Sequence, residues 1–229
     1  MDIHLIAPKD KSQWRDKWKK CYKFWENSSY NVIIWDDEKI DNILKQDDIM
    51  LFEVLNQLPP IYKYDYVRYI ILDKFGGAYF DLDVEVIVDF IPSLHPDEVY
   101  ISEGQPFKDE EIKRDFGDKL SPSFFELIET PIDYALSNHI MISPKNRGLW
   151  KIIKNKVKIN LIKYYKTHNG NFINVLKVVG PIALSRIVFE YGFHHKLLSY
   201  HHFDVGDDDR SAFVVCKHHK TFNWVKEEK

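Results

Sequence analysis

The feature that most constrains the fold is a helical stretch that passes through two glycines straight into a strand. Residues 61–75 have helical spacing of apolar side chains, and Gly76 and Gly77 end it, because glycine readily adopts the left-handed conformation that closes a helix. From Ala78 to Val88 apolar and polar residues alternate, which predicts one strand with a buried face. A helix followed at once by a strand predicts helices layered on a sheet.

The amino-terminal part repeats this arrangement. Residues 3–6 are a short apolar run stopped by Pro8, residues 14–25 have helical spacing, and residues 32–35 are a second apolar run. Strand–helix–strand alternation over so short a length is typical of a βαβ unit. Two further helices are expected, at residues 49–58 and 148–165, and an exposed loop or short helix at 104–118. The sequence therefore predicts an α/β fold in one domain over residues 1–229.

Composition excludes several classes of protein. The formal net charge is −3, which argues against a nucleic-acid partner, because proteins that bind a phosphate backbone usually have a clear basic excess. Hydrophobic residues make up 45% of the chain, enough for a core without disulfide crosslinks. We find no signal peptide and no apolar run near the ~20 residues of a membrane span. We expect a cytoplasmic protein, soluble or peripheral on a membrane.

The chain has two cysteines, Cys21 and Cys216. Two residues so far apart cannot form a disulfide framework or a CxxC zinc motif. One long-range disulfide is an alternative, but we favour two reduced, buried thiols.

Three carboxylates occupy alternate positions of the predicted strand. On a strand, Asp81, Asp83 and Glu85 would point to one side and their apolar neighbours to the other. Like charges about 7 Å apart repel one another. A divalent cation with oxygen ligands would relieve this repulsion, and a diphosphate would complete its coordination. The alternative is an exposed amphipathic strand without an ion.

Asp65 and Arg68 lie three residues apart on the preceding helix and therefore share a face. The carboxylate could hold a ribose hydroxyl, while the guanidinium could contact phosphate or orient the acidic row. The alternative is a surface ion pair, which would contribute less than about 1 kcal/mol.

The run from Tyr64 to Asp83 resembles the DXD sugar-binding region of a family of retaining glycosyltransferases. That family includes the initiating α-1,6-mannosyltransferases and the α-1,4-N-acetylglucosaminyl- and galactosyltransferases, and the glucosylating clostridial toxins are related to it. The shared pattern is Asp-x-x-Arg followed by Gly-Gly-x-Tyr-x-Asp-x-Asp. Other similar segments follow in the family's order: Ile3-His4-Leu5-Ile6, Trp35-Asp36-Asp37, Ser137-Asn138-His139, Val179-Gly180-Pro181, and His218-His219 ahead of Trp224.

The resemblance implies a GT-A fold, a Rossmann-like α/β sandwich that binds a metal ion and a nucleotide-sugar at the carboxyl ends of its strands. It implies a catalytic set of Asp81, Asp83 and Asn138, with Asn138 lining the anomeric centre. The implied substrate-binding residues are Asp65, Arg68, Gly77, Tyr79, Asp81, Asn138, Gly180, Pro181 and Trp224.

The resemblance also implies a metal ion, Mn²⁺ or Mg²⁺, held by Asp81, Asp83 and His219. His219 lies five residues before Trp224, which would close on the diphosphate. An Asp–Asp–His set with diphosphate oxygens suits Mn²⁺. The alternative is that His219 belongs to a histidine-rich chain end, since His194-His195 and His201-His202 are also pairs.

We therefore expect a metal-dependent retaining glycosyltransferase that acts on a glycan, lipid or protein hydroxyl. A UDP-sugar is the favoured donor and GDP-mannose the alternative. The expected chemistry is same-face attack, in which the leaving phosphate oxygen takes the acceptor proton.

Two other functions remain alternatives. A haloacid-dehalogenase-like phosphatase also opens with a strand and Asp-x-Asp, and residues 206–209 could supply its late acidic loop. A degenerate GT-A binding module is suggested by Ala7 and by residues 220–223, which depart from the family's pattern.

Overall fold

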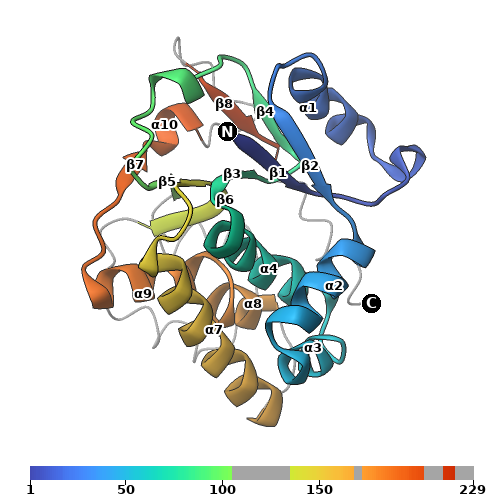
Figure 1. Ribbon diagram of the computed structural model, residues 1–229, viewed down its shortest axis with the longest axis vertical. Helices are drawn as coiled ribbons and strands as arrows, with labels where there is room; N and C mark the ends of the chain where they lie inside the picture. The colour runs from blue at the N-terminus through green and yellow to red at the C-terminus, as the bar shows by residue number, and fades with distance from the viewer. Residues whose placement is uncertain (105–134, 168–171, 204–213, 220–229) are drawn as a thin grey trace, which may run out of the picture.

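The computed structural model describes residues 1–104, 135–167, 172–203 and 214–219 (Figure 1). Most of the predicted loop at 104–118 lies outside these residues, as do Trp224 and the acidic run at 206–209. Within the described ranges, no helix is long and apolar enough to cross a membrane.

A mixed sheet of six described strands forms the centre of the molecule. In spatial order the strands are β2 (Asn31–Trp35), β1 (Asp2–Ile6), β3 (Gly77–Phe80), β6 (Ala135–Ser143), β5 (Tyr100–Gly104) and β7 (Lys196–Leu198). Strand β1 runs parallel to both β2 and β3, while β6 is antiparallel to β3 and β5. The three parallel strands confirm the predicted βαβ arrangement and place their carboxyl ends at one edge.

Helices cover one face of this sheet (Figure 1). They are α2 (Asp37–Asp47), α3 (Ile49–Leu55), α4 (Pro60–Phe75), α7 (Gly148–Thr167), α8 (Phe172–Val178) and α9 (Pro181–Tyr191). The other face packs against α1 (Asp16–Glu26), the short helix α10 (Tyr200–Phe203) and a second sheet of β4 (Val84–Val86) and β8 (Cys216–His218). Short 3-10 turns lie at Lys11–Gln13 and Ile91–Ser93. The α/β fold class is confirmed.

Strand alternation divides the core between these two faces. Phe80 points toward α1, where its ring centroid lies 4.7 Å from that of Trp25. Tyr79 points the opposite way and packs in the helical layer with α4 and α7. Successive side chains of a strand face opposite sides of its sheet. At the end of β3, alternate residues therefore point toward the helical layer, while the residues between them pack in the core on the α1 face of the sheet.

Helix α4 begins at Pro60, which suits the first turn of a helix, and ends at Gly76 with φ +66°. A Cβ at Gly76 would lie 2.5 Å from the backbone nitrogen of Lys145, so the close approach also requires glycine. Nine residues of α4 are buried, and Tyr69 stacks on Trp150 of α7. The helix predicted over 61–75 is confirmed, and its burial fixes the position of the side chains near its middle.

The prediction of one continuous strand from Ala78 to Val88 is wrong. The backbone N–H of Asp81 donates to the carbonyl of His139 on β6, and the N–H of Val84 then donates to the carbonyl of Asp81, which closes a turn. The chain leaves the large sheet at this turn and enters the small one as β4. The sequence still alternates because Val84 is buried in the small sheet, as it would be if β3 continued in the large one.

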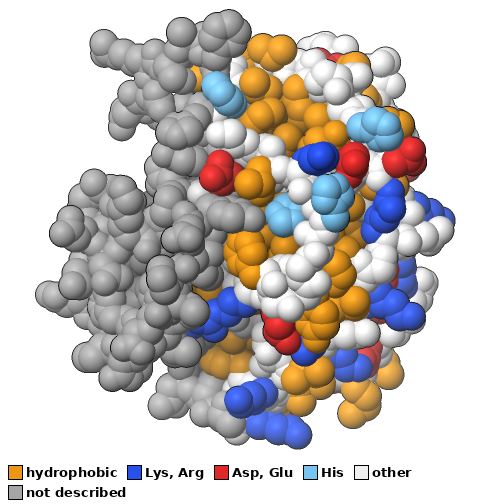
Figure 2. Space-filling model, turned by 90° about the vertical axis from the view of Figure 1, so that its left-hand side faces the viewer, with side chains coloured by type: hydrophobic (Ala, Val, Ile, Leu, Met, Phe, Trp, Pro, Cys, Tyr) orange, Lys and Arg blue, Asp and Glu red, His pale blue; other side chains and the backbone are white. Residues whose placement is uncertain are grey.

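The surface and the cysteines agree with the sequence interpretation. Both Cys21 and Cys216 are free and buried, as predicted. Figure 2 shows one face, on which the described Lys and Arg side chains are intermixed with acidic, histidine and hydrophobic side chains. On that described face, positive charge is not gathered into one continuous surface.

Candidate active site

The candidate site lies where the parallel strands end. In the sheet register, Ile6 of β1 is opposite Trp35 of β2, and Leu5 is opposite Phe80 of β3. The residues that follow these strands, which include Asp36 and Asp81, therefore lie together at the carboxyl-terminal edge of the sheet. Ligands of open α/β sheets bind at the carboxyl ends of the strands, so this edge is the expected location.

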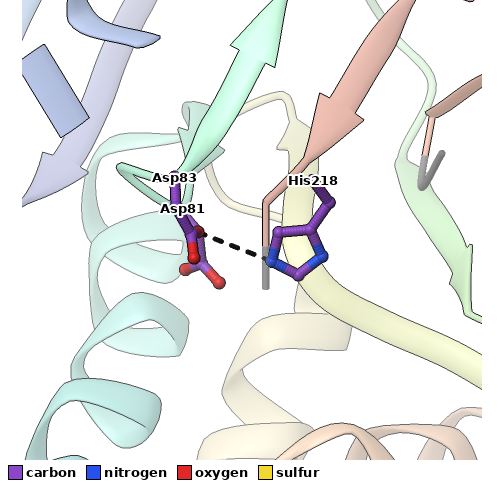
Figure 3. Close-up of side chains that lie close together, drawn as sticks. All are labelled: Asp81, Asp83 and His218. Carbon is purple, nitrogen blue, oxygen red and sulfur yellow. Dashed lines mark ion pairs between the residues drawn. The ribbon is translucent and has the colours of Figure 1, made fainter. Parts of the chain in front are cut away.

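Two aspartates and a histidine meet at this edge (Figure 3). One ligand atom from each of Asp81, Asp83 and His218 lies within 4.8 Å of the other two. The Nε2 atom of His218 is 3.5 Å from Asp83 Oδ1. His218 reaches the aspartates because β8 pairs with β4, where it lies opposite Val84, the residue just after the turn. Oxygen and imidazole ligands at this spacing form a candidate site for a divalent cation.

The structure places His218, rather than the predicted His219, in this cluster. Adjacent residues of an extended chain face opposite sides, so the two histidines cannot both face the aspartates. The Nε2 atom of His219 lies 3.0 Å from Glu85 Oε2, and its backbone N–H donates to the carbonyl of Asp83. Glu85 also pairs with Lys20, and it is not part of the described cluster of Asp81, Asp83 and His218.

Arg68 connects the cluster to helix α4. One guanidinium nitrogen lies 2.5 Å from Asp65 Oδ1, and the other lies 3.2 Å from Asp81 Oδ1 and donates to the backbone carbonyl of Asn138 at 2.8 Å. The guanidinium also lies over the ring of Tyr79, 4.9 Å from its centroid. Arg68 is buried at 4% exposure, so its cation contacts protein groups from α4, β3 and β6.

Two neighbours shape the positions of the carboxylates. The Tyr79 hydroxyl donates to Asp81 Oδ1 at 2.7 Å. Gly180 precedes Pro181 at the start of α9, and a Cβ added there would lie 3.1 Å from Asp65 Oδ2. The absence of a side chain at Gly180 is therefore what allows α9 to approach Asp65.

Burial raises the pKa values of two carboxylates in the site. It raises the pKa of Asp65 to about 6, although the Arg68 guanidinium opposes the shift. Burial also raises the pKa of Asp81 above its usual range, with Arg68 opposing the shift and the Asp83 carboxylate adding to it. Carboxylates whose ionised form is disfavoured in this way gain from a further positive charge. The electrostatics therefore fit a bound cation beside Asp81 and Asp83.

A cleft of about 340 Å³ opens at the same edge, beyond β1 and β2. Lys9 and Lys11 line it from the segment after β1, and Asp36 and Lys39 line it from the start of α2. Sequence reasoning missed this cleft, although two lysines close behind a strand end were a visible signal. Glu38 also lines the cleft and pairs with Lys9, so the cleft combines ammonium and carboxylate groups.

The remaining predicted residues divide into three groups. Asn138 is buried at 7% exposure beside Arg68, so Asp65, Arg68, Tyr79, Asp81 and Asn138 are brought together. Gly77 lies at the opposite end of β3, about 13 Å along an extended strand from Asp81. A Cβ at Gly77 would lie 2.6 Å from the carbonyl oxygen of Asp2, so this glycine serves strand packing. Trp224 lies outside the described residues.

Residues 12–101 match a family described as "Glycosyltransferase sugar-binding region containing DXD motif". The match includes Asp65, Arg68 and the Asp81-x-Asp83 turn. In these residues the chain is similar to the DXD-type glycosyltransferases. The match to a sugar-binding region favours a glycosyltransferase over the alternative of a haloacid-dehalogenase-like phosphatase.

Curated relatives of this chain include fungal proteins. "Inositol phosphoceramide mannosyltransferase 1" of Schizosaccharomyces pombe is 27% identical over 178 residues, which cover 77% of this chain and 44% of that protein. "Mannosyl phosphorylinositol ceramide synthase CSH1" of Saccharomyces cerevisiae is 35% identical over 72 residues, which cover 31% of this chain and 19% of that protein. The chain spans less than half the length of these curated relatives.

Among solved structures, "PaToxG Glycosyltransferase" is similar with a TM-score of 0.53 at 16% identity, covering 83% of this chain and 69% of that one. At this level of identity the likeness concerns the fold alone. The predicted GT-A type of fold is confirmed.

Proposed function

We propose that this chain is a DXD-type glycosyltransferase that moves a sugar from a nucleotide diphosphate sugar to an acceptor hydroxyl, with retention at the anomeric carbon. The observation that carries the proposal is the meeting of Asp81, Asp83 and His218 beside the buried Asp65–Arg68 pair. A cation site next to buried groups that can bind hydroxyls is what a sugar diphosphate requires. The family match supports the same reaction class.

The residues present fit a divalent cation. Asp81 and Asp83 offer oxygen atoms and His218 offers a ring nitrogen, a set that suits Mn²⁺, with Mg²⁺ as the second candidate. Their ligand atoms lie within 4.8 Å of one another, and bonds of about 2.1 Å to one ion need small side-chain rotations. Such an ion neutralises negative charge that builds on a departing diphosphate.

The protein's own residues hold the sugar and keep the carboxylates in place. We assign the buried Asp65 and the half-buried Asp81 to hydroxyl groups of the sugar or ribose, because a carboxylate can accept hydrogen bonds from both. Arg68 acts as a positioning residue, since its guanidinium is occupied by these two carboxylates and the Asn138 carbonyl. The Asn138 side chain lines the anomeric centre, and the leaving phosphate oxygen takes the acceptor proton on the same face.

The lysine-lined cleft is the proposed place of the nucleotide. Lys9, Lys11 and Lys39 lie at the edge where the strands end, on the same side as Asp81. Ammonium groups attract the phosphate oxygens of a nucleotide without fixing one geometry. This placement leaves the sugar to face Asp65 and Asn138.

The names of the curated relatives narrow the substrates that we propose. Both relatives are named for the transfer of mannose to an inositol-containing ceramide. We therefore put GDP-mannose ahead of the UDP-sugars as donor, and the inositol hydroxyls of a phosphoceramide lipid ahead of glycan and protein acceptors. This order reverses the preference for UDP that the sequence motif favoured.

A donor panel tests the proposal. Nucleotide release from GDP-mannose and from several UDP-sugars is measured with Mn²⁺, with and without an inositol phosphoceramide acceptor. We expect release from GDP-mannose that rises with the acceptor and falls at least about 100-fold in Asp83→Asn. Asp16→Asn is the matched control, because Asp16 is fully exposed on α1, and it should behave as wild type.

Two outcomes would overturn the proposal. An Asp83→Asn variant that transfers sugar at the wild-type rate would remove the cation site from the chemistry. Binding of donor without release of nucleotide, for every donor and acceptor tested, would favour the degenerate binding module instead.

A further inference from the structure

The imidazole rings of His139 and His218 lie face to face. Their centroids are 4.4 Å apart and their planes differ by 13°. His139 lies on β6 of the large sheet, whereas His218 lies on β8 of the small one. This contact therefore joins the two sheets next to the aspartate cluster.

His139 is itself held rigidly. It is buried at 1% exposure, and its Nε2 atom lies 3.3 Å from the carbonyl oxygen of Phe203 at the end of α10. A carbonyl oxygen can only accept, so Nε2 carries the hydrogen, and in the neutral ring Nδ1 accepts from the Ser137 hydroxyl that contacts it. The carbonyl of His139 accepts from the N–H of Asp81 at 2.8 Å. One residue thus contacts both the DXD turn and His218.

We propose that His139 is a positioning residue that orients the His218 ring toward Asp81 and Asp83 and thereby raises the affinity of the cation site. The inference rests on the proposed function, in which these three residues are the metal ligands. A parallel ring at contact distance restricts rotation of the His218 side chain. The hydrogen bonds of His139 in turn fix the plane against which His218 rests.

This role differs from that of a merely structural histidine, and the chain offers a comparison. His4 is buried in the same sheet, with Nε2 2.9 Å from the carbonyl oxygen of Gly76 and Nδ1 accepting from Trp35 at 3.1 Å. Both histidines are buried, and both ring nitrogens of each have polar contacts. The described side-chain contacts of His4 are to Gly76, Trp35 and Phe75, and its backbone lies opposite Tyr79 in the sheet. None of these contacts is to Asp81, Asp83 or His218, so its replacement should disturb the core and leave the cation site in place.

Mn²⁺ titrations followed by electron paramagnetic resonance test the inference without any assay of transfer. Loss of a group that orients a metal ligand typically costs 10- to 100-fold in affinity. We expect His139→Leu to raise the dissociation constant for Mn²⁺ at least about 10-fold. His139→Phe keeps a flat ring against His218 and should recover part of this loss. Ser137→Ala should weaken binding less than His139→Leu.

His4→Leu is the matched control and should lower the melting temperature while leaving the dissociation constant unchanged. Melting curves without metal show which variants are folded, and Ser137→Ala and His139→Phe carry the test if His139→Leu does not fold. Asp83→Asn separates the two proposals. If it binds Mn²⁺ as wild type does, the proposed cation site itself fails. If Asp83→Asn loses Mn²⁺ while the folded His139 variants bind it normally, the positioning role is overturned and the proposed function stands.

Discussion

Arg68 and Asp65 face each other across one turn of α4, with a guanidinium nitrogen 2.5 Å from Asp65 Oδ1 and side-chain exposures of 5% and 7%. The alternative of a surface ion pair is therefore wrong. An exposed pair contributes little because water screens it, whereas breaking a buried pair leaves a charge that has lost both its partner and its hydration. The same guanidinium also reaches Asp81, so one residue neutralises the buried Asp65 and the half-buried Asp81.

Replacing Arg68 should therefore destabilise the protein strongly. We expect Arg68→Met to lower the free energy of unfolding by about 3–5 kcal/mol, because Asp65 and Asp81 would lose their common cation. Arg68→Lys keeps the charge without the planar fork and should cost less. Urea denaturation measures both. Arg147→Ala, at an exposed arginine, should stay within about 0.5 kcal/mol of wild type, and an equal effect at the two positions would contradict this account.

The two adjacent histidines should behave differently in Mn²⁺ binding. His218→Ala removes the ring that lies 3.5 Å from Asp83, so the dissociation constant for Mn²⁺ should rise at least about 10-fold. His219→Ala removes a ring that contacts Glu85 and should change this constant less than about threefold. Calorimetric titration compares them. A larger effect at His219 would restore the assignment made from the sequence.

Gly180 and Gly148 allow a matched test of how tightly α9 packs against Asp65. A Cβ at Gly180 would lie 3.0 Å from the Leu176 Cα and 3.1 Å from Asp65 Oδ2, so Gly180→Ala should cost about 1–3 kcal/mol. Gly148 opens α7 and has nothing within 4 Å of a Cβ, so Gly148→Ala should be neutral or slightly stabilising. Thermal melts measure both. Equal stability of the two variants would show that α9 adjusts freely.

The contribution of Glu85 should depend on pH. Burial by itself would raise the pKa of Glu85. Hydrogen bonds from Lys20 and His219 outweigh this effect and lower the pKa below its ordinary value of 4.5. Because the folded pKa is the lower one, this stabilisation is complete above the unfolded value and is lost as the pH falls through the folded value. Glu85→Gln should therefore cost up to about 1 kcal/mol at pH 7 and nothing once both states are protonated. Urea midpoints across this range test the sign, and a difference that grows in acid would contradict it.

Both thiols should be unreactive in the folded protein. Burial, together with the nearby Glu85 and Asp83 carboxylates, raises the pKa of Cys21 to about 12, and burial raises the pKa of Cys216. The thiolate is the reactive form, so Ellman's reagent at pH 8 should find no fast thiol until the protein is unfolded. It should then find both. A fast reaction in the folded state would show that one of these side chains is reached by solvent.

Much of the fold could be predicted because its signals are local. The apolar runs at 3–6 and 32–35 and the helical patterns at 14–25, 49–58, 61–75 and 148–165 all correspond to elements of the described structure. The break after Phe80 could not be predicted, because the alternating pattern satisfies two sheets as well as one. Asp81 still donates to His139 of β6, 58 residues further along the chain, and β3 ends where the Asp81 carbonyl accepts from the N–H of Val84 in a turn.

The site was predictable where one element carries the pattern and not where elements meet. Asp65 and Arg68 share one helix, so their spacing revealed their pairing. The choice between His218 and His219 depends on how β8 pairs with β4, and residues 216–218 alone do not reveal that pairing. The stacking of His139 on His218 joins two sheets and leaves no periodic signal in the sequence.

The pairing of β4 with β8 lets Cys216 influence which histidine becomes the proposed metal ligand. Cys216 has no exposed surface, Lys217 is next along the strand, and His218 faces the aspartates. A slip of one residue would bring His219 into the place of His218 and supply an equivalent imidazole, but it would also bury the Lys217 ammonium among apolar side chains. Cys216 therefore favours the strand register in which His218, and not His219, faces the aspartates of the proposed cation site.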